Sequence, residues 1–242
     1  MGNVAQEERS FHNLLCAMFN QEYSVTDSDE LNRMTVLADC YRAVPILSNT
    51  IAGTFYSSPG LINSIRTNPC SVLVSAYKLR HKLLFRESFI HVLGPWSNPR
   101  YKQLPEEQQD LIKMATDRYT EMEAKIFQLL KDILELAARE PPSYNNASGG
   151  FPQAASSVLC RVSSSYCGKT GRLMYPSFLQ NCVYLPTVKD KVTPLLKNHL
   201  ILNKSAVPGQ TDYKQNNDFR DFFLCFDIKD HELPWDISKK EW

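Results

Sequence analysis

Apolar residues in the first 140 positions recur at intervals of three and four, which is the period of an amphipathic helix. Proline and glycine mark where the predicted helices begin and end. Val44-Pro45 and Pro105 suit a first turn, whereas Gly94-Pro95 and Pro141-Pro142 end a helix. Asp27, with Glu30 three residues later, is typical of an N-terminal capping box. The pattern predicts helices over residues 10–20, 27–41, 44–55, 69–79, 83–92 and 105–139.

The longest predicted helix carries a stripe of apolar residues at spacings of four and three, over about three heptads. Such a stripe needs a partner surface, which is either the rest of the same domain or a helix of another molecule. Phe127, Leu130 and Leu134 widen the stripe and favour packing within the domain. The stripe begins at Ala115, and its candidate interaction residues are Tyr119, Met122, Ile126, Leu129, Ile133 and Leu136.

The sequence divides into three regions. Residues 8–140 are expected to form a helical interaction domain, and residues 141–157, rich in Ser, Asn, Gly and Ala, a linker. Residues 158–242 hold only short apolar runs, at 158–162, 182–185 and 222–228, which are interpreted as strands or buried loop segments. The expected fold is mainly α, a helical bundle with one long helix, followed by an irregular or weakly α+β C-terminal segment.

Charge is unevenly distributed along the chain, although its total is only +1. Residues 141–210 contain seven Lys or Arg and one acidic residue, Asp190, which gives this segment a net charge of +6. Tyr166, Tyr175 and Tyr184 in the same segment offer stacking surfaces. Nucleic-acid binding through residues 141–210 is therefore the alternative function, and it predicts an affinity that falls steeply as salt concentration rises.

The N-terminus shows no apolar run of signal-peptide length, and no stretch approaches the roughly 18 continuous apolar residues of a membrane span. The seven cysteines lack the paired spacing of a secreted disulfide framework. These features predict a cytoplasmic or nuclear protein with reduced thiols and no membrane partner.

Candidate sites for chemistry are weak. Residues 163–170 end in Gly-Lys-Thr like a phosphate-binding loop, but Pro176 follows too soon for the helix that such a loop needs. Cys160, Cys167, Cys182 and His199 are ligand types for zinc, yet they lack closely spaced cysteine pairs. No nucleophile or metalloprotease motif is found, and only nine glycines are present. We expect no enzyme activity, no cofactor and no metal.

Two blocks carry a resemblance to a known family. Within residues 11–55, an apolar helix ends in a small turn at 14–23 and precedes Leu37-Ala38-Asp39-Cys40-Tyr41 and Val44-Pro45. This block resembles the C-terminal helical half of a BTB/POZ domain. Residues 75–96, SAYKLRHKLLFRESFIHVLGPW, are similar to the post-BTB region of fungal BTB-like proteins. Together the resemblance covers about 130 residues.

The strands and first helices of a BTB domain do not fit into the ten residues before Phe11, so the resemblance implies a truncated module. In the family, that half supplies much of the dimer surface and part of the cullin-binding surface, and only helical interaction scaffolding is carried over. Phe11 and its helix then need another cover. We expect a non-enzymatic adaptor or scaffold that binds other proteins through apolar helix faces, with self-association as one form of that binding.

Overall fold

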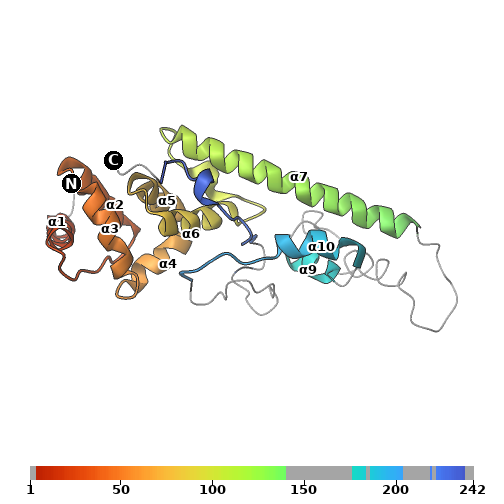
Figure 1. The fold of residues 1–242 in the computed structure, drawn as a ribbon, viewed down its shortest axis with the longest axis horizontal. Coiled ribbons are helices and arrows are strands. Elements are labelled where there is room, and N and C mark those ends of the chain that lie inside the picture. The colour runs from red at the N-terminus through yellow and green to blue at the C-terminus, as the bar shows by residue number, and fades with distance from the viewer. Residues whose placement is uncertain (1–3, 140–175, 184–185, 204–218, 220–221, 238–242) are drawn as a thin grey trace.

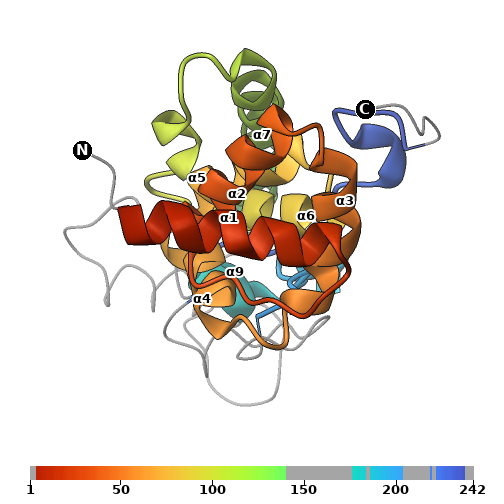
Figure 2. The ribbon, with the colours of Figure 1, turned by 90° about the vertical axis from the view of Figure 1, so that its left-hand side faces the viewer.

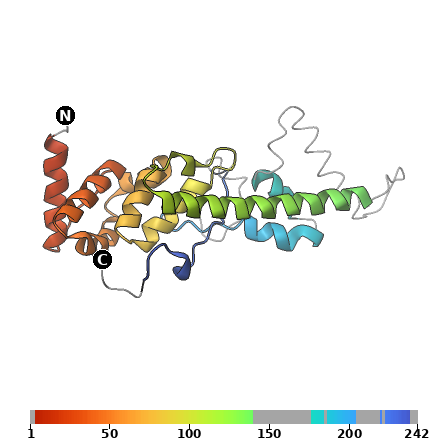
Figure 3. The same cartoon turned by 90° about the horizontal axis from the view of Figure 1, so that it is seen from above.

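The computed structural model describes residues 4–139, 176–183, 186–203, 219 and 222–237, and in these residues the chain is mainly helical and contains no β-strand. Helices α1 to α6 gather at one end, and the long helix α7 extends away from them with α9 and α10 beside its distal part (Figures 1 and 3). The predicted linker at 141–157, the apolar run at 158–162 and the residues 163–170 lie outside the described part of the chain.

The helices have the following bounds: α1 Val4–Met18, α2 Ser28–Cys40, α3 Val44–Thr50, α4 Pro59–Thr67, α5 Pro69–Lys78, α6 Lys82–Leu93, α7 Gln109–Arg139, α9 Pro176–Cys182 and α10 Pro186–Leu195. Short 3-10 helices occupy η1 Ile51–Thr54, η2 Arg100–Gln103 and η5 Asp230–Glu232. Helices α4, α9 and α10 were not predicted. Helix α4 contributes only Leu61 and Ile65 as buried apolar residues over its nine positions, and α9 and α10 lie in the segment that was expected to be irregular or weakly α+β. Helix α7 begins at Gln109, four residues after the predicted start at Pro105.

Side-chain and backbone caps fix several helix ends. The Asp27 side chain accepts hydrogen bonds from the N–H groups of Asp29 and Glu30, as the predicted cap requires. Three helix C-termini close through a non-glycine residue in the left-handed region: Asn20, Arg42 and Arg80, with φ of 55°, 54° and 48°. After each, the next N–H bonds a carbonyl five positions back, as in a Schellman motif.

Helix α6 lies at the centre of the packing. Residues from Leu84 to Leu93 are almost all buried, so this helix is covered around most of its circumference. Phe85 stacks against Phe89 and meets Trp235 edge-to-face, with ring centroids 5.9 and 5.0 Å apart. Helix α6 thus contacts both the N-terminal helices and the C-terminal segment.

The apolar run at 222–228 is a buried, extended segment and not part of a sheet, and the 182–185 run contributes the last residue of α9. The segment makes a single antiparallel bridge, between Phe222 and Pro95. The N–H of Phe223 donates to the Gly94 carbonyl at 2.9 Å. A Cβ on Gly94 would lie 2.8 Å from the Ile90 carbonyl oxygen and 3.2 Å from that of Phe223, so only glycine allows this approach.

A buried carboxylate fastens the segment after α10 to α6. Glu87 is 2 % exposed. Its Oε1 accepts hydrogen bonds from the N–H groups of Leu202 and Asn203, and its Oε2 accepts one from Ile201, at 2.9 to 3.1 Å. Burial raises the pKa of the Glu87 carboxyl above its ordinary value, and the three N–H groups oppose that rise.

Charged residues at the surface join the η5 segment to α6 and α7. Asp230 forms ion pairs with Lys82 and Arg86 of α6, and Glu232 forms one with Arg118 of α7. These pairs are partly exposed, so they orient the segment more than they stabilise it.

Glu87→Ala is expected to lower the free energy of unfolding by about 3 kcal/mol, because three N–H groups lose their acceptor in a buried site. Glu87→Gln keeps one carbonyl oxygen as an acceptor and should lose less. Urea denaturation of both variants provides the measurement. Glu107→Ala, at an exposed position, is the matched control and should stay within about 0.5 kcal/mol of the unsubstituted chain. Equal losses in Glu87→Ala and Glu107→Ala would contradict the role assigned to Glu87.

Because the His91 side chain is buried, we expect the protein to lose stability in acid. Burial, followed by the charges of Arg100 and Arg66, lowers the pKa of His91 to about 3, against an ordinary value of 6.5. His91 of the unfolded chain therefore binds a proton near pH 6.5, whereas His91 of the folded protein stays neutral down to about pH 3. The contribution of His91 to the free energy of unfolding is lost as the pH falls from 6.5 towards 3. Unfolding free energies measured at pH 7 and pH 4 should differ less in His91→Gln than in the unsubstituted chain. The same pH dependence in both proteins would refute this assignment.

Candidate interaction surfaces

The stripe predicted on the longest helix faces the inside of the molecule. Of its six candidate residues, Met122, Ile126, Leu129 and Ile133 are buried, and Tyr119 and Leu136 are partly buried against the core. Helix α7 packs there on α6, η2 and α10 (Figure 3). This placement agrees with packing within the chain, the first of the two interpretations of the stripe.

Tyr119 shows how the stripe is held in place. Its hydroxyl donates to the Trp96 carbonyl at 2.6 Å, and its ring stacks on Trp96 with centroids 4.9 Å apart. Burial, then the nearby charge of Glu123, raises the pKa of Tyr119 to about 12. The phenol is therefore an anchor that stays protonated.

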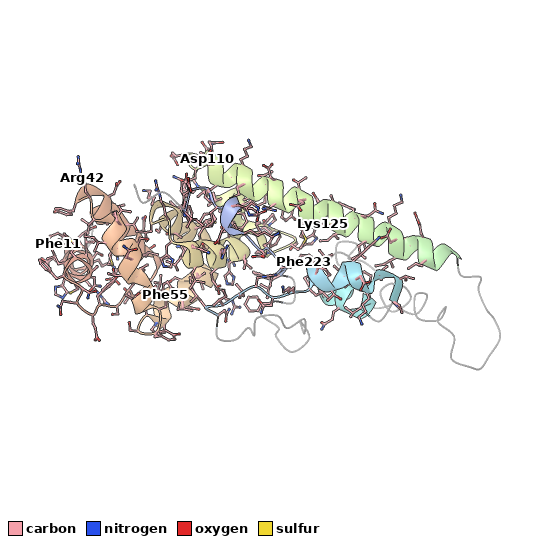
Figure 4. The ribbon with its side chains drawn as sticks, in the orientation of Figure 1. Phe11, Arg42, Phe55, Asp110, Lys125 and Phe223 are labelled. Carbon is pink, nitrogen blue, oxygen red and sulfur yellow. The ribbon has the colours of Figure 1, made fainter. Side chains whose placement is uncertain are left out.

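A groove of about 540 Å³ lies between α7, α10 and residues 225–227, where Lys125 and Phe223 are labelled in Figure 4. Its apolar lining includes Met122 and Leu129 of the predicted stripe together with Leu195 and Phe226. The cations on its rim are each paired with a carboxylate in the described chain: Arg118 with Glu121 and Glu232, Lys125 with Glu121, and Lys191 with Asp132. The groove thus has an apolar wall and a neutralised rim, which offers little to hold a charged ligand.

An uncovered apolar surface lies at the opposite end of the molecule. Val4, Phe11 and Met18 follow one another at intervals of seven along α1 and are 69, 38 and 39 % exposed. The half-buried Leu15 lies on the same side of the helix, and the exposed ring of Tyr41 contacts Phe11 at 5.6 Å between centroids. These five residues are called the N-terminal apolar face. Figure 2 shows α1 crossing the outside of the bundle, with its other side on the remaining helices.

Polar contacts on the inner side of α1 explain why its apolar side faces outward. Glu30, 1 % exposed, accepts hydrogen bonds from the Asn13 side chain at 3.0 Å and the Thr26 N–H at 2.6 Å, and pairs with Arg9 at 3.1 Å. Asn13 also donates to the Ser24 carbonyl at 2.9 Å. Rotating α1 to bury Phe11 would break this network and leave a buried carboxylate unpaired, which is costly.

Lys78, Arg80, Lys82 and Arg86 form a basic cluster in the sequence, which the structure pairs in part, and the zinc alternative remains incomplete. Lys82 and Arg86 of that cluster pair with Asp230, and His81 caps α6 by accepting the Leu84 N–H at 3.2 Å. Cys182 is buried and donates to the Phe178 carbonyl, and burial raises its pKa to about 12, so its thiol stays protonated. Cys160 and Cys167 lie outside the described residues, and within those residues no three metal-binding side chains gather.

The sequence indicated that Phe11 and its helix need another cover, but it did not indicate which residues form the N-terminal apolar face or that Glu87 is a structural centre. Phe11, Leu15 and Met18 were assigned to an amphipathic helix, but their helical period does not say which side is covered. The buried network of Asn13 and Glu30, 17 positions apart, decides it. A signal was present in Asn13, a polar residue between apolar neighbours on the predicted helix.

Adjacent positions on α7 test this assignment of its faces. Ile126→Ala is expected to lower the free energy of unfolding by about 2 to 4 kcal/mol, because it opens a cavity in the core. Phe127→Ala, at a residue that is 51 % exposed, is the matched control and should change it by less than about 1 kcal/mol. Thermal or urea denaturation provides the measurement. If Phe127→Ala lowers the free energy of unfolding more than Ile126→Ala does, the assignment of the buried and exposed faces is wrong.

None of the helices in the described part of the chain is long and apolar enough to cross a membrane. No protein-family model, no curated protein and no solved structure matches this chain.

Proposed function

We propose that the chain is a non-enzymatic protein-interaction module, and that its N-terminal apolar face binds the same face of a second copy. The observation that carries the proposal is the row of Val4, Phe11 and Met18 on a helix whose other side is fixed by a buried polar network. Large apolar side chains exposed together on one side of a folded helix favour association, because burying them removes apolar area from water.

The row is suited to pairing about a two-fold axis. Val4 and Met18 lie seven positions on either side of Phe11, about 10 Å each way at 1.5 Å per residue. In an antiparallel pair centred on Phe11, the Val4 end of one helix meets the Met18 end of the other, and the two Phe11 rings meet at the centre. Each copy contributes the same patch, which is the geometry of an isologous interface.

Charge favours the antiparallel arrangement over the parallel one. The carboxylates of α1, Glu7 and Glu8, lie in its N-terminal half, and residues 9–20 contain none. A parallel pair would place these acids side by side, whereas an antiparallel pair separates them towards opposite ends.

The BTB/POZ resemblance is consistent with this proposal, since it implies helical interaction scaffolding, and it remains a prediction. The nucleic-acid alternative also remains a prediction, because most of residues 141–210 lie outside the described chain. Of the described cations in that segment, Lys191 is paired with Asp132.

Light scattering coupled to size-exclusion chromatography, over a range of concentrations of the full chain, tests the proposal. A dimer is expected, and Phe11→Glu should raise its dissociation constant at least about tenfold, because the substitution places two carboxylates at the centre of the interface. A concentration-independent monomer would overturn self-association through this face.

Phe127→Glu is the matched control, since it introduces the same charge at an exposed aromatic residue on α7 (Figure 4 marks the neighbouring Lys125). It should leave the N-terminal dimer intact. Circular dichroism of both variants, with unchanged helical signal, establishes that altered association is not loss of fold. A dimer that survives Phe11→Glu but not Phe127→Glu would move the interface to α7.

A further inference from the structure

Helix α7 carries a second row of side chains on the side that faces away from the core, and Phe127 and Leu134 are its large apolar members. Thr120, Ala124, Phe127, Lys131 and Leu134 are exposed and follow one another at spacings of four, three, four and three. Phe127 and Leu134 are 51 and 58 % exposed, and Leu130 lies half-buried beside them. This set of residues is called the outer stripe.

The outer stripe is distinct from the buried stripe described above. At 100° per residue, Phe127 points about 160° away from Leu129, so the two stripes occupy nearly opposite sides of the helix. Figure 1 shows α9 and α10 below the distal part of α7, and no described segment lies above that part of the helix in this view. The stripe from 120 to 134 runs for about 21 Å at 1.5 Å per residue, the length of two heptads.

The charges along the outer stripe limit what can cover it. Asp117, Glu121 and Glu135 lie on one flank and Glu123 on the other, while Lys131 lies within the stripe. Glu121 and Glu135 pair with Lys125 and Lys131. Asp117 and Glu123 form no ion pair within the described chain. The flanks are therefore predominantly acidic.

These flanks disfavour a second copy of the chain. An antiparallel pair centred on Gln128 would bring Glu121 of one copy to Glu135 of the other, twice. A parallel pair would place Glu123 opposite Gln128 and gain no ion pair. Anionic lipid and nucleic acid carry the same sign of charge as the flanks and are disfavoured for that reason.

The geometry points to an amphipathic helix of another protein as the occupant, with Leu-type or Ile-type residues in its seam and Lys or Arg at its flanking positions. Its apolar residues cover Phe127 and Leu134, and its cations meet Glu123 and Asp117. Apolar seam residues supply most of the affinity, and the flanking charges choose the partner. This inference is independent of the N-terminal apolar face.

Two synthetic peptides of three heptads test it, with identical Leu/Ile seams and flanking positions that are all Lys in one and all Glu in the other. Fluorescence anisotropy measures their binding to the full chain. The Lys peptide is expected to bind, at least about tenfold more tightly than the Glu peptide, and more weakly as salt rises. Equal binding of the two peptides, or no binding of the Lys peptide, would overturn the inference.

Variants locate the site. Phe127→Glu and Leu134→Glu should each weaken Lys-peptide binding at least about tenfold, because each places a carboxylate in the apolar seam. Phe11→Glu is the matched control and should leave it unchanged. Unchanged binding by Phe127→Glu and Leu134→Glu, with native helical signal, contradicts the site. If either substitution abolishes a dimer of the chain, the outer stripe binds a second copy, which also contradicts the inference. If the chain binds phosphatidylserine vesicles and Phe127→Glu abolishes that binding, the stripe binds lipid, which contradicts it as well.

Discussion

The structure depends on one buried carboxylate. Glu87 lies on α6, and by accepting three N–H groups from residues 201–203 it fixes the chain that leaves α10 to the N-terminal helices. An unpaired carboxylate in this position would be very unfavourable, so the two parts are fixed together or not at all. The Phe222–Ile228 segment then completes the cover of α6 through Phe223 and Gly94. Helix α6 is thus the common support of segments more than 100 positions apart.

The spacing of apolar residues and the residues that start or stop helices were sufficient to predict most of the helices in the first 140 positions. Asp27 and the prolines could be interpreted in this way because they act through local backbone geometry. The same signals were insufficient for α4, which has few apolar residues, and for the 222–228 run, which is apolar because it packs on α6 and not because it pairs in a sheet. Partners far apart in sequence, such as Arg86 and Asp230, leave no periodic signal. The six candidate interaction residues on α7 pack inside the molecule, and the exposed sides of α1 and α7 became apparent only from their packing.

Helices α1 and α7 share one feature at opposite ends of the molecule, an exposed side that carries apolar residues. Each is packed on one side and exposes large apolar side chains on the other, Val4, Phe11 and Met18 on α1 and Phe127 and Leu134 on α7. The charges beside the rows differ: on α1 the carboxylates lie in one half, which permits two copies to pair antiparallel, whereas on α7 acids occur along the stripe and repel a like helix. The proposed partners follow from this difference, a second copy for one surface and a basic helix for the other.

The left-handed helix ends bear on how the sequence can change. Arg42 and Arg80 hold a conformation that costs an ordinary L-residue about 1 kcal/mol or more and costs glycine almost nothing. At the exposed Arg42 turn, glycine would therefore raise the stability of the chain. A lineage that gained glycine at position 42 would tolerate a damaging change elsewhere, such as a new polar side chain at a binding surface, without losing its fold. Backbone strain at this turn is thus a latent source of evolvability.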